Sequence, residues 1–237
     1  MLEWLQSAIA RSQQDLPEDF EGYLLGRGVR ESAIEQHGLG CWNSPSDQAP
    51  DPKFVEKFGS CGERLNGLLI RPLWNGKGDL LGMEARDLES GKFFVYFLDR
   101  ARWNPVFIGL RPDTMKKIWE GANVWLTTGG FDVTVLEHIV PDRDVVLGTG
   151  RPRLTYAHSE FFRRFLSSYA QVNLVFSRDE EGRKGINGAE KVWGALRSLD
   201  RVKVRNRDIP YRGGKDPCEI WERLGTPGLR EAFSAVL

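Results

Sequence analysis

The sequence predicts an α/β protein whose second half holds a parallel sheet flanked by helices, preceded by an amino-terminal mixed α+β subdomain. Three short apolar runs carry this prediction: 123–128, 144–148 and 172–176. Each run leads into a turn, and helix-length amphipathic stretches separate the runs, which is typical of strands that pair in parallel. Such sheets present their ligand sites at the carboxyl ends of the strands. We therefore expect functional groups directly after these runs.

The composition limits the class of protein. The chain has 237 residues, 41% of them hydrophobic, and eight Trp, which is enough to build one compact unit or two small subdomains. No apolar run is long enough for a membrane span and no basic start indicates a signal peptide, so we expect a soluble, cytoplasmic protein without a membrane partner. Three widely spaced cysteines, without a Cys-x-x-Cys pair, argue against a structural zinc site and a disulfide framework.

Charge is unevenly distributed along the chain. The formal net charge is zero, but residues 143–215 contain 16 Lys or Arg against 8 Asp or Glu, so this stretch carries +8 and the remainder −8. This segregation favours a surface that faces a polyanion such as nucleic acid. Solvated helix faces would give the same count, and both interpretations stay open.

The first half of the chain alternates helical segments with a hairpin. In order, we expect an amphipathic helix at 2–14, two short helices around Gly28 within 20–38, a surface loop at 43–52, a hairpin at 65–88 that turns at 75–78, and a strand at 93–97. The hairpin carries Arg71 and Arg86, whose side chains are candidates for contact with phosphate. An exposed hairpin arginine is as well explained by simple solvation.

The last third of the chain contains two further helices and a basic strand. The helices are expected at 158–168 and 186–199. Residues 202–207 alternate apolar and basic side chains, so one face of a strand would present Lys203, Arg205 and Arg207 in a row. This row is the best local candidate for phosphate contact. The alternative is an edge strand that its charges keep soluble.

The central runs resemble a known family. They read Asn-Val-Trp-Leu-Thr-Thr-Gly-Gly-Phe-Asp at 123–132, Leu-Gly-Thr at 147–149 and Ser-Arg-Asp-Glu-Glu-Gly at 177–182. This order is similar to that of the Toprim domain of bacterial and phage DnaG-type primases, where a strand ends in Glu-Gly-x-x-Asp and a later one in Asp-x-Asp-x-x-Gly. Segments 23–40, 67–86 and 213–217 also resemble the primase core. The resemblance implies an amino-terminal primase-core subdomain over 1–115 and a Toprim-like subdomain with carboxyl-terminal helices over 116–237.

The acidic positions of the resemblance are incomplete. Gly129 stands where the family has the Toprim Glu, and Ser177 stands where it has the first Asp of the Asp-x-Asp pair. In the family these carboxylates hold magnesium, a hard cation that prefers oxygen ligands. What remains as a weak metal-binding set is Asp132, Asp179 and Asp216. The resemblance therefore implies a degenerate site, which uses Mg²⁺ or Mn²⁺ if it is active and otherwise needs no cofactor.

Each remaining carboxylate also has a structural interpretation. Asp216 precedes Pro217 and is expected to cap a helix. Asp132 is interpreted as the cap of the helix that follows Phe131, and Asp179 lies in a turn ending in glycine, where Asp is common. Glu181 is a candidate replacement, because alternation along an extended turn would point it the same way as Asp179.

The leading functional prediction is a DnaG-primase-like protein of DNA replication, phage-borne or otherwise mobile. It would bind single-stranded DNA, DNA/RNA or replication partners such as the replicative helicase, with metal-dependent catalysis lost or weakened. The alternative is an active primase that makes short RNA primers with Asp132, Asp179, Glu181 and Asp216. A Toprim nuclease is a third interpretation, which the primase-like segments before residue 100 disfavour.

Overall fold

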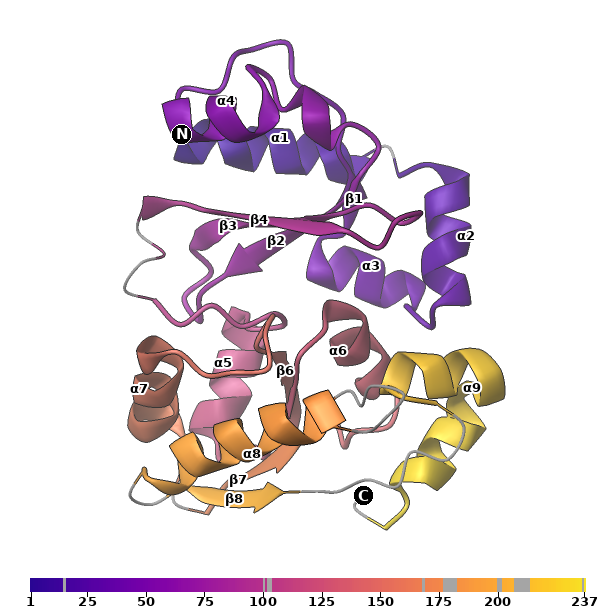
Figure 1. Cartoon of the computed structure of the whole chain (residues 1–237), viewed down its shortest axis with the longest axis vertical. Coiled ribbons are helices and arrows are strands. Elements are labelled where there is room, and N and C mark those ends of the chain that lie inside the picture. The colour runs from indigo at the N-terminus through magenta and orange to yellow at the C-terminus, as the bar shows by residue number, and fades with distance from the viewer. Residues whose placement is uncertain are drawn as a thin grey trace. The chain divides into compact units, whose positions relative to one another are not determined.

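The computed structural model describes residues 1–14, 16–99, 101, 104–167, 169–176, 183–199, 202–206, 214–235 and 237, with the backbone alone for 183–188, 205 and 206. The chain forms two compact units (Figure 1). The first comprises Met1–Leu25, Arg30–Trp74 and Asp79–Asn104, and the second comprises Gly26–Val29, Asn75–Gly78 and Pro105–Leu237. None of the helices in these ranges is long and apolar enough to cross a membrane.

The first unit is built on an antiparallel sheet with the strand order β1-β2-β3-β4. Its elements are α1 (Leu2–Gln14), α2 (Glu18–Gly26), α3 (Glu31–His37), β1 (Gly40–Cys41), α4 (Pro52–Phe58), a 3₁₀ turn (Glu63–Leu65), β2 (Leu69–Trp74), β3 (Leu80–Arg86) and β4 (Phe93–Phe97). The predicted helix at 2–14, the hairpin turning at 75–78 and the strand at 93–97 are confirmed.

One face of this sheet is closed by α1 and α4 (Figure 1). Leu5 and Ile9 from α1 pack with Phe54 from α4 against Met83 and Tyr96 of the sheet. Helix α4 was not predicted, because the Ser, Pro, Asp and Asn residues of 43–52 are typical of a loop that reaches the first residue of this helix. It begins where the Asp51 carboxylate accepts a hydrogen bond from the Lys53 N–H at 2.9 Å, and Pro52 fills the first turn.

The second unit is built on a parallel sheet with the strand order β6-β5-β7-β8, which confirms the predicted fold class. Its elements are α5 (Pro112–Trp119), β5 (Val124–Thr127), α6 (Gly130–Leu136), β6 (Val145–Gly148), α7 (Tyr156–Phe165), β7 (Gln171–Leu174), α8 (Arg183–Arg197), β8 (Lys203–Asn206) and α9 (Pro217–Phe233). The predicted helices at 158–168 and 186–199 correspond to α7 and α8, which begin two to three residues earlier.

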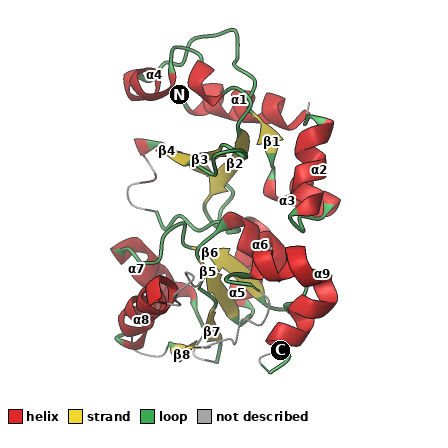
Figure 2. Cartoon of the chain, turned by 45° about the vertical axis from the view of Figure 1, so that its right-hand side comes forward, coloured by secondary structure: helices red, strands yellow, loops and turns green. Residues whose placement is uncertain are grey.

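Alternating side chains cover both faces of the parallel sheet with apolar contacts. Val124 and Leu126 pack in the core formed with α5, α7 and α8. Trp125 points the other way, where its ring centroid lies 6.4 Å from that of Phe233 in α9. Figure 2 shows α7 and α8 on one side of the sheet and α6 and α9 on the other. Because both faces are covered, the ends of the strands are the parts of the sheet open to a ligand.

Candidate functional site

The topology of the parallel sheet points to one location for a site. The chain passes from β5 outward to β6 and then returns to the opposite side of β5 to form β7, so the strand order reverses between β5 and β7. In open α/β sheets ligands bind at the carboxyl ends of the strands at such a reversal. Here β5 leads into Gly129, and β7 leads into residues 177–182, which lie outside the described residues.

Asp132 lies in the first turn of α6, beside the carboxyl end of β5. Its side chain is buried, with 5% exposure, and its Oδ2 accepts a hydrogen bond of 3.4 Å from the Thr127 hydroxyl. The interpretation of Asp132 as a helix cap is wrong, because α6 begins at Gly130 and its N-cap residue is Gly129. The two consecutive glycines let the helix start earlier than the sequence suggested. The carboxylate is therefore enclosed by the fold at this edge.

Because Gly129 has no side chain, the Asp132 carboxylate can lie close to its Cα atom. A Cβ atom added at Gly129 would lie 3.0 Å from Asp132 Oδ2, which is tighter than ordinary contact. The backbone of Gly129 is extended, with φ −94° and ψ 151°, so any residue can adopt it. A side chain at position 129 is thus allowed by the backbone but would require the Asp132 carboxylate to shift by a few tenths of an ångström.

Asp216 caps α9, as the sequence predicted. Its carboxylate accepts a hydrogen bond of 2.8 Å from the Glu219 N–H, and Pro217 stands in the first turn. Cys218 follows, with 4% exposure, and its thiol lies 3.5 Å from the Arg27 carbonyl oxygen. Burial raises the pKa of the Cys218 thiol to about 12, with the Asp132 and Asp216 charges adding to the rise and the Arg27 charge opposing it.

Arg27 and Glu222 complete this cluster, and sequence reasoning missed both. The Arg27 guanidinium forms an ion pair with Glu222, and its central carbon lies 5.5 Å from the centre of the Phe131 ring. Glu222 Oε1 also lies 4.0 Å from the sulfur of Cys218, which precedes Glu222 by one helical turn. The spacing of Cys218 and Glu222, four residues apart on one helix, was the available signal. In this cluster a cation of the protein itself is paired with the carboxylate of Glu222.

Gly28 anchors Arg27 in the second unit. Its φ of +81° is a left-handed conformation that favours glycine, and a Cβ there would lie 2.6 Å from the Trp221 ring. The Gly28 carbonyl oxygen lies 2.7 Å from Nε2 of His138. Segment Gly26–Val29 is thereby fixed on α9 and on the turn after α6.

The predicted metal ligands are only partly placed. Among the residues that the structure describes, no three His, Cys, Asp or Glu side chains come together as a set that could hold a metal ion. Ser177, Asp179 and Glu181 lie outside the described residues. The described carboxylates do not by themselves fit a magnesium site, because Asp216 is engaged as a helix cap and Asp132 is enclosed beside Gly129.

Solved structures share the folds of these two units. A DNA primase domain from Pseudomonas aeruginosa matches with a TM-score of 0.69 and 18% identity, over 98% of this chain and 78% of its own. The DnaG primase catalytic domain bound to single-stranded DNA matches with a TM-score of 0.67 and 15% identity, over 99% and 80%. The fold is that of the DnaG-type primase core. No protein-family model and no curated protein matches the sequence.

The structure of the Aquifex aeolicus primase, which contains zinc-binding and RNA polymerase domains, is of a longer chain than this one. It matches with a TM-score of 0.65 and 17% identity over 98% of this chain. The present chain spans 61% of that chain. The primase-type fold is therefore shared across both units described here, while the Aquifex chain also contains residues outside the matched part.

The predicted nucleic-acid contacts occupy different environments in the primase-type fold. Arg71 is buried in β2, with 5% exposure, and its Nη1 lies 4.0 Å from Glu84 Oε2, so the expectation of an exposed hairpin arginine is wrong for Arg71. Arg86, at the end of β3, is half-buried. Lys203 is exposed on β8, which is an edge strand of the parallel sheet. Arg205 also lies in β8, whereas Arg207 and the Arg205 side chain lie outside the described parts.

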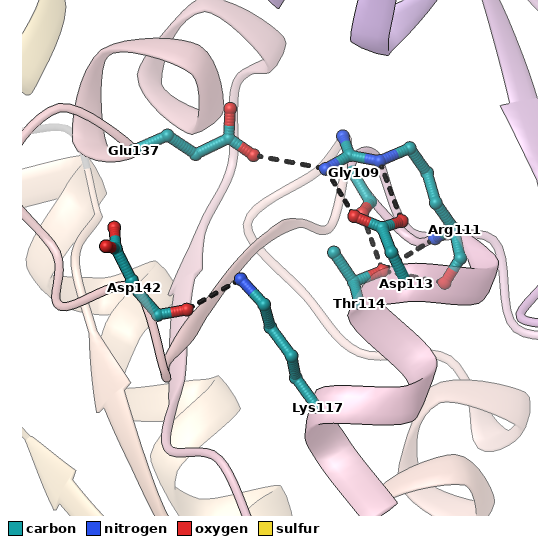
Figure 3. A network of polar contacts seen from close by, with 7 residues as sticks. All are labelled: Gly109, Arg111, Asp113, Thr114, Lys117, Glu137 and Asp142. Carbon is teal, nitrogen blue, oxygen red and sulfur yellow. Dashed lines mark hydrogen bonds and ion pairs between the residues drawn. The ribbon is translucent and has the colours of Figure 1, made fainter.

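A polar network at the start of α5 serves the fold of the second unit (Figure 3). Arg111 Nη2 lies 3.7 Å from Glu137 Oε1, and Arg111 Nε donates to Asp113 Oδ1 at 3.2 Å. Burial alone would raise the Asp113 pKa, but the hydrogen bond and the charge of Arg111 outweigh it and lower that pKa. The Thr114 hydroxyl accepts from the Arg111 N–H at 2.7 Å. These contacts tie the start of α5 to the end of α6.

Proposed function

We propose that this chain is a DnaG-primase-like protein of DNA replication that binds nucleic acid or replication partners, with metal-dependent catalysis lost or weakened. One observation carries the proposal. At the edge of the parallel sheet where a ligand site is expected, Asp132 is enclosed beside Gly129 and Asp216 is engaged as a helix cap. A divalent cation needs several oxygen ligands directed at one point, and these two carboxylates have other roles.

Nucleic-acid binding in this proposal is supported by two independent lines. The stretch 143–215 carries an excess of 8 positive charges. The DnaG catalytic domain that shares the fold binds single-stranded DNA. Single-stranded DNA or a DNA/RNA hybrid is therefore the first ligand to test, and the replicative helicase is the first protein partner. A phage or other mobile origin is part of the same proposal.

The experiment that tests the loss of catalysis is template-dependent incorporation of labelled ribonucleotides on single-stranded DNA. We expect no incorporation with magnesium, and little or none with manganese. The alternative is an active primase with a reorganised acid set of Asp132, Asp179, Glu181 and Asp216, with Mg²⁺ or Mn²⁺ as cofactor. The fold match over 98% of the chain favours that alternative. Robust primer synthesis that Asp179→Ala abolishes would overturn the proposal in its favour.

A further inference from the structure

Strand β4 exposes aromatic rings in an unusual pattern. Phe93 is 56% exposed, Phe97 is 47% exposed and Phe94 is 38% exposed, whereas Tyr96 is 7% exposed. The rings of Phe94 and Tyr96 each lie 6.3 Å from the ring of Phe58 in α4, so these two side chains belong to the face that α4 covers. Since side chains alternate along a strand, Phe93 and Phe97 stand together on the opposite face, called the open face below.

The open face becomes more exposed from β2 toward β4. On this face, Leu69 and Leu73 of β2 are each 4% exposed, and Arg71 is 5% exposed. In the neighbouring strand β3, Arg86 is half-buried and stands directly opposite Phe93. The two exposed phenylalanines on this side of β4 thus form the rim of the open face, and Arg86 is the residue paired with one of them in the β3–β4 register.

Gly82 keeps the ring of Phe97 uncovered. It stands directly opposite Phe97 in the β3–β4 register. A Cβ atom at Gly82 would collide with the Tyr96 carbonyl oxygen and lie 3.0 Å from Phe97 Cα. No larger residue fits here without moving β4, so the position of β3 directly opposite Phe97 contributes no side chain over its ring.

One backbone carbonyl group on the outer edge of β4 is already engaged within the first unit. Lys57 Nζ donates a hydrogen bond of 2.8 Å to the Val95 carbonyl oxygen, which points away from β3. A second copy of this chain, or a peptide that added a strand at this edge, would have to displace that ammonium group. An occupant of the open face is therefore expected to use the ring faces rather than backbone pairing.

We propose that Phe93 and Phe97 form a stacking platform for two bases of a single-stranded nucleic acid. An aromatic ring can stack on the face of any base, and in a duplex those faces are hidden by neighbouring base pairs. Four residues along a strand separate the two rings by about 13 Å, which exceeds the stacked base step of about 3.4 Å, so each ring meets a different base. Arg86, opposite Phe93, supplies positive charge for the connecting phosphates.

This inference rests on the proposed nucleic-acid binding and names the ligand and the residues that hold it. The test measures binding of a short single-stranded DNA that carries 2-aminopurine, whose fluorescence reports stacking. Phe93→Ala with Phe97→Ala should weaken binding about 30-fold or more, which is the usual contribution of two stacked bases at its low end. The dependence of affinity on salt should not change, because no charge is removed.

Two controls keep the result specific. Phe93→Tyr with Phe97→Tyr retains both rings and should bind like the parent, which separates stacking from damage to β4. Tyr156→Ala removes an 81% exposed ring from α7 in the other unit and should leave binding unchanged. Circular dichroism of each variant checks that the sheet is formed.

Three outcomes overturn the inference, and they are distinguishable. A parent that binds no single-stranded DNA would overturn the proposed nucleic-acid binding and the platform together. A parent that binds, with an Ala variant that binds equally well, would remove the platform and leave the proposed function standing. Equal losses for single-stranded and duplex DNA would show that the rings act through the shape of the protein and not by stacking on bases.

Discussion

The two units of the molecule differ in how far the side chains of their candidate functional surfaces are exposed to solvent. In the first unit, the rings of Phe93 and Phe97 on β4 are about half exposed to solvent, and these are the rings on which we propose that bases stack. In the second unit, the carboxyl end of β5 leads to Asp132, which is enclosed, and to the ion pair of Arg27 with Glu222. Polar groups at this edge have become part of the packing. The comparison shows that, within one primase-type fold, aromatic side chains are exposed in one unit while the acidic side chain beside β5 is buried in the other.

The largest expected effect comes from breaking the anchor of Arg27. Gly28→Ala places a methyl group 2.6 Å from the Trp221 ring at a φ of +81°. The left-handed strain and the overpacking together should lower the free energy of unfolding by about 2–4 kcal/mol. Urea unfolding of the purified chain measures this change.

The matched control is another Gly→Ala change in the same part of the sequence. Gly22 lies in α2 with no atom within 4 Å of an added Cβ and no positive φ. Gly22→Ala should stabilise its helix by up to about 1 kcal/mol. Equal effects of the two changes would contradict the role of Gly28 as an anchor of the second unit.

The basic row of β8 offers the second unit its own route to nucleic acid. Replacing Lys203, Arg205 and Arg207 with Gln should weaken binding to single-stranded DNA and reduce the slope of log affinity against log salt by about 0.7 for each lost contact. Filter binding at several salt concentrations measures the slope. If it does not change, these residues are an edge strand that its charges keep soluble.

A matched control removes charge elsewhere in the same unit. Lys116 in α5 is exposed, forms an ion pair with Glu120 on its own helix and lies outside the basic stretch 143–215. Lys116→Gln should leave the salt slope nearly intact. Comparison of this variant with the β8 variant and the Phe93/Phe97 variant shows which unit supplies charge contacts and which supplies stacking.

Sequence patterns predicted the local features of both units well. Residues 2–14 and 93–97 form the expected helix and strand, and Asp216 caps α9 with Pro217 behind it. Each of these depends on neighbours within a few positions, so periodicity and capping preferences suffice. The order of the three apolar runs likewise predicted the parallel sheet.

The features that were missed depend on contacts between distant positions. Arg71 is buried beside Glu84 because β2 and β3 pair in one particular register. Arg27 meets Glu222 across 195 positions of sequence. Local patterns contain no information on such partners. The position of Asp132 was mistaken for a different reason, since Gly129 and Gly130 let α6 begin before the residue that looked like its cap.

Restoring acids tests whether two substitutions separate this chain from a working metal site. In Gly129→Glu with Ser177→Asp, the new carboxylates follow β5 and β7, which are paired neighbours. Clustered like charges beside Asp132, and the tight contact of 3.0 Å at position 129, should destabilise the metal-free protein by about 1–2 kcal/mol. Added magnesium should reverse this loss, because an ion that binds only the folded state stabilises it.

The readout is the melting temperature as a function of magnesium concentration. The control, Gly129→Gln with Ser177→Asn, has the same bulk without the charges and should not respond to magnesium. The parent should respond little. A parent with a strong magnesium-dependent rise would show that its own acids already hold the ion, and the proposal of a degenerate site would have to be withdrawn.

The smallest expected effect concerns the buried thiol of Cys218. Its pKa is raised to about 12 in the folded protein, mainly by burial, from about 8.5 in an unfolded chain. The unfolded state therefore loses its proton first as pH rises. The stabilising contribution is fully present below about pH 8.5 and is lost between there and about pH 12, by at most about 1.4 kcal/mol per pH unit. Between pH 8 and pH 9.5, the free energy of unfolding measured with urea should fall by about 1 kcal/mol more for the parent than for Cys218→Ala. Cys41, whose thiol pKa is also raised by burial, is present in both proteins and cancels in the comparison. If the two proteins lose stability equally, the Cys218 thiol is reached by solvent, and the edge beside Asp132 is more open than its packing indicates.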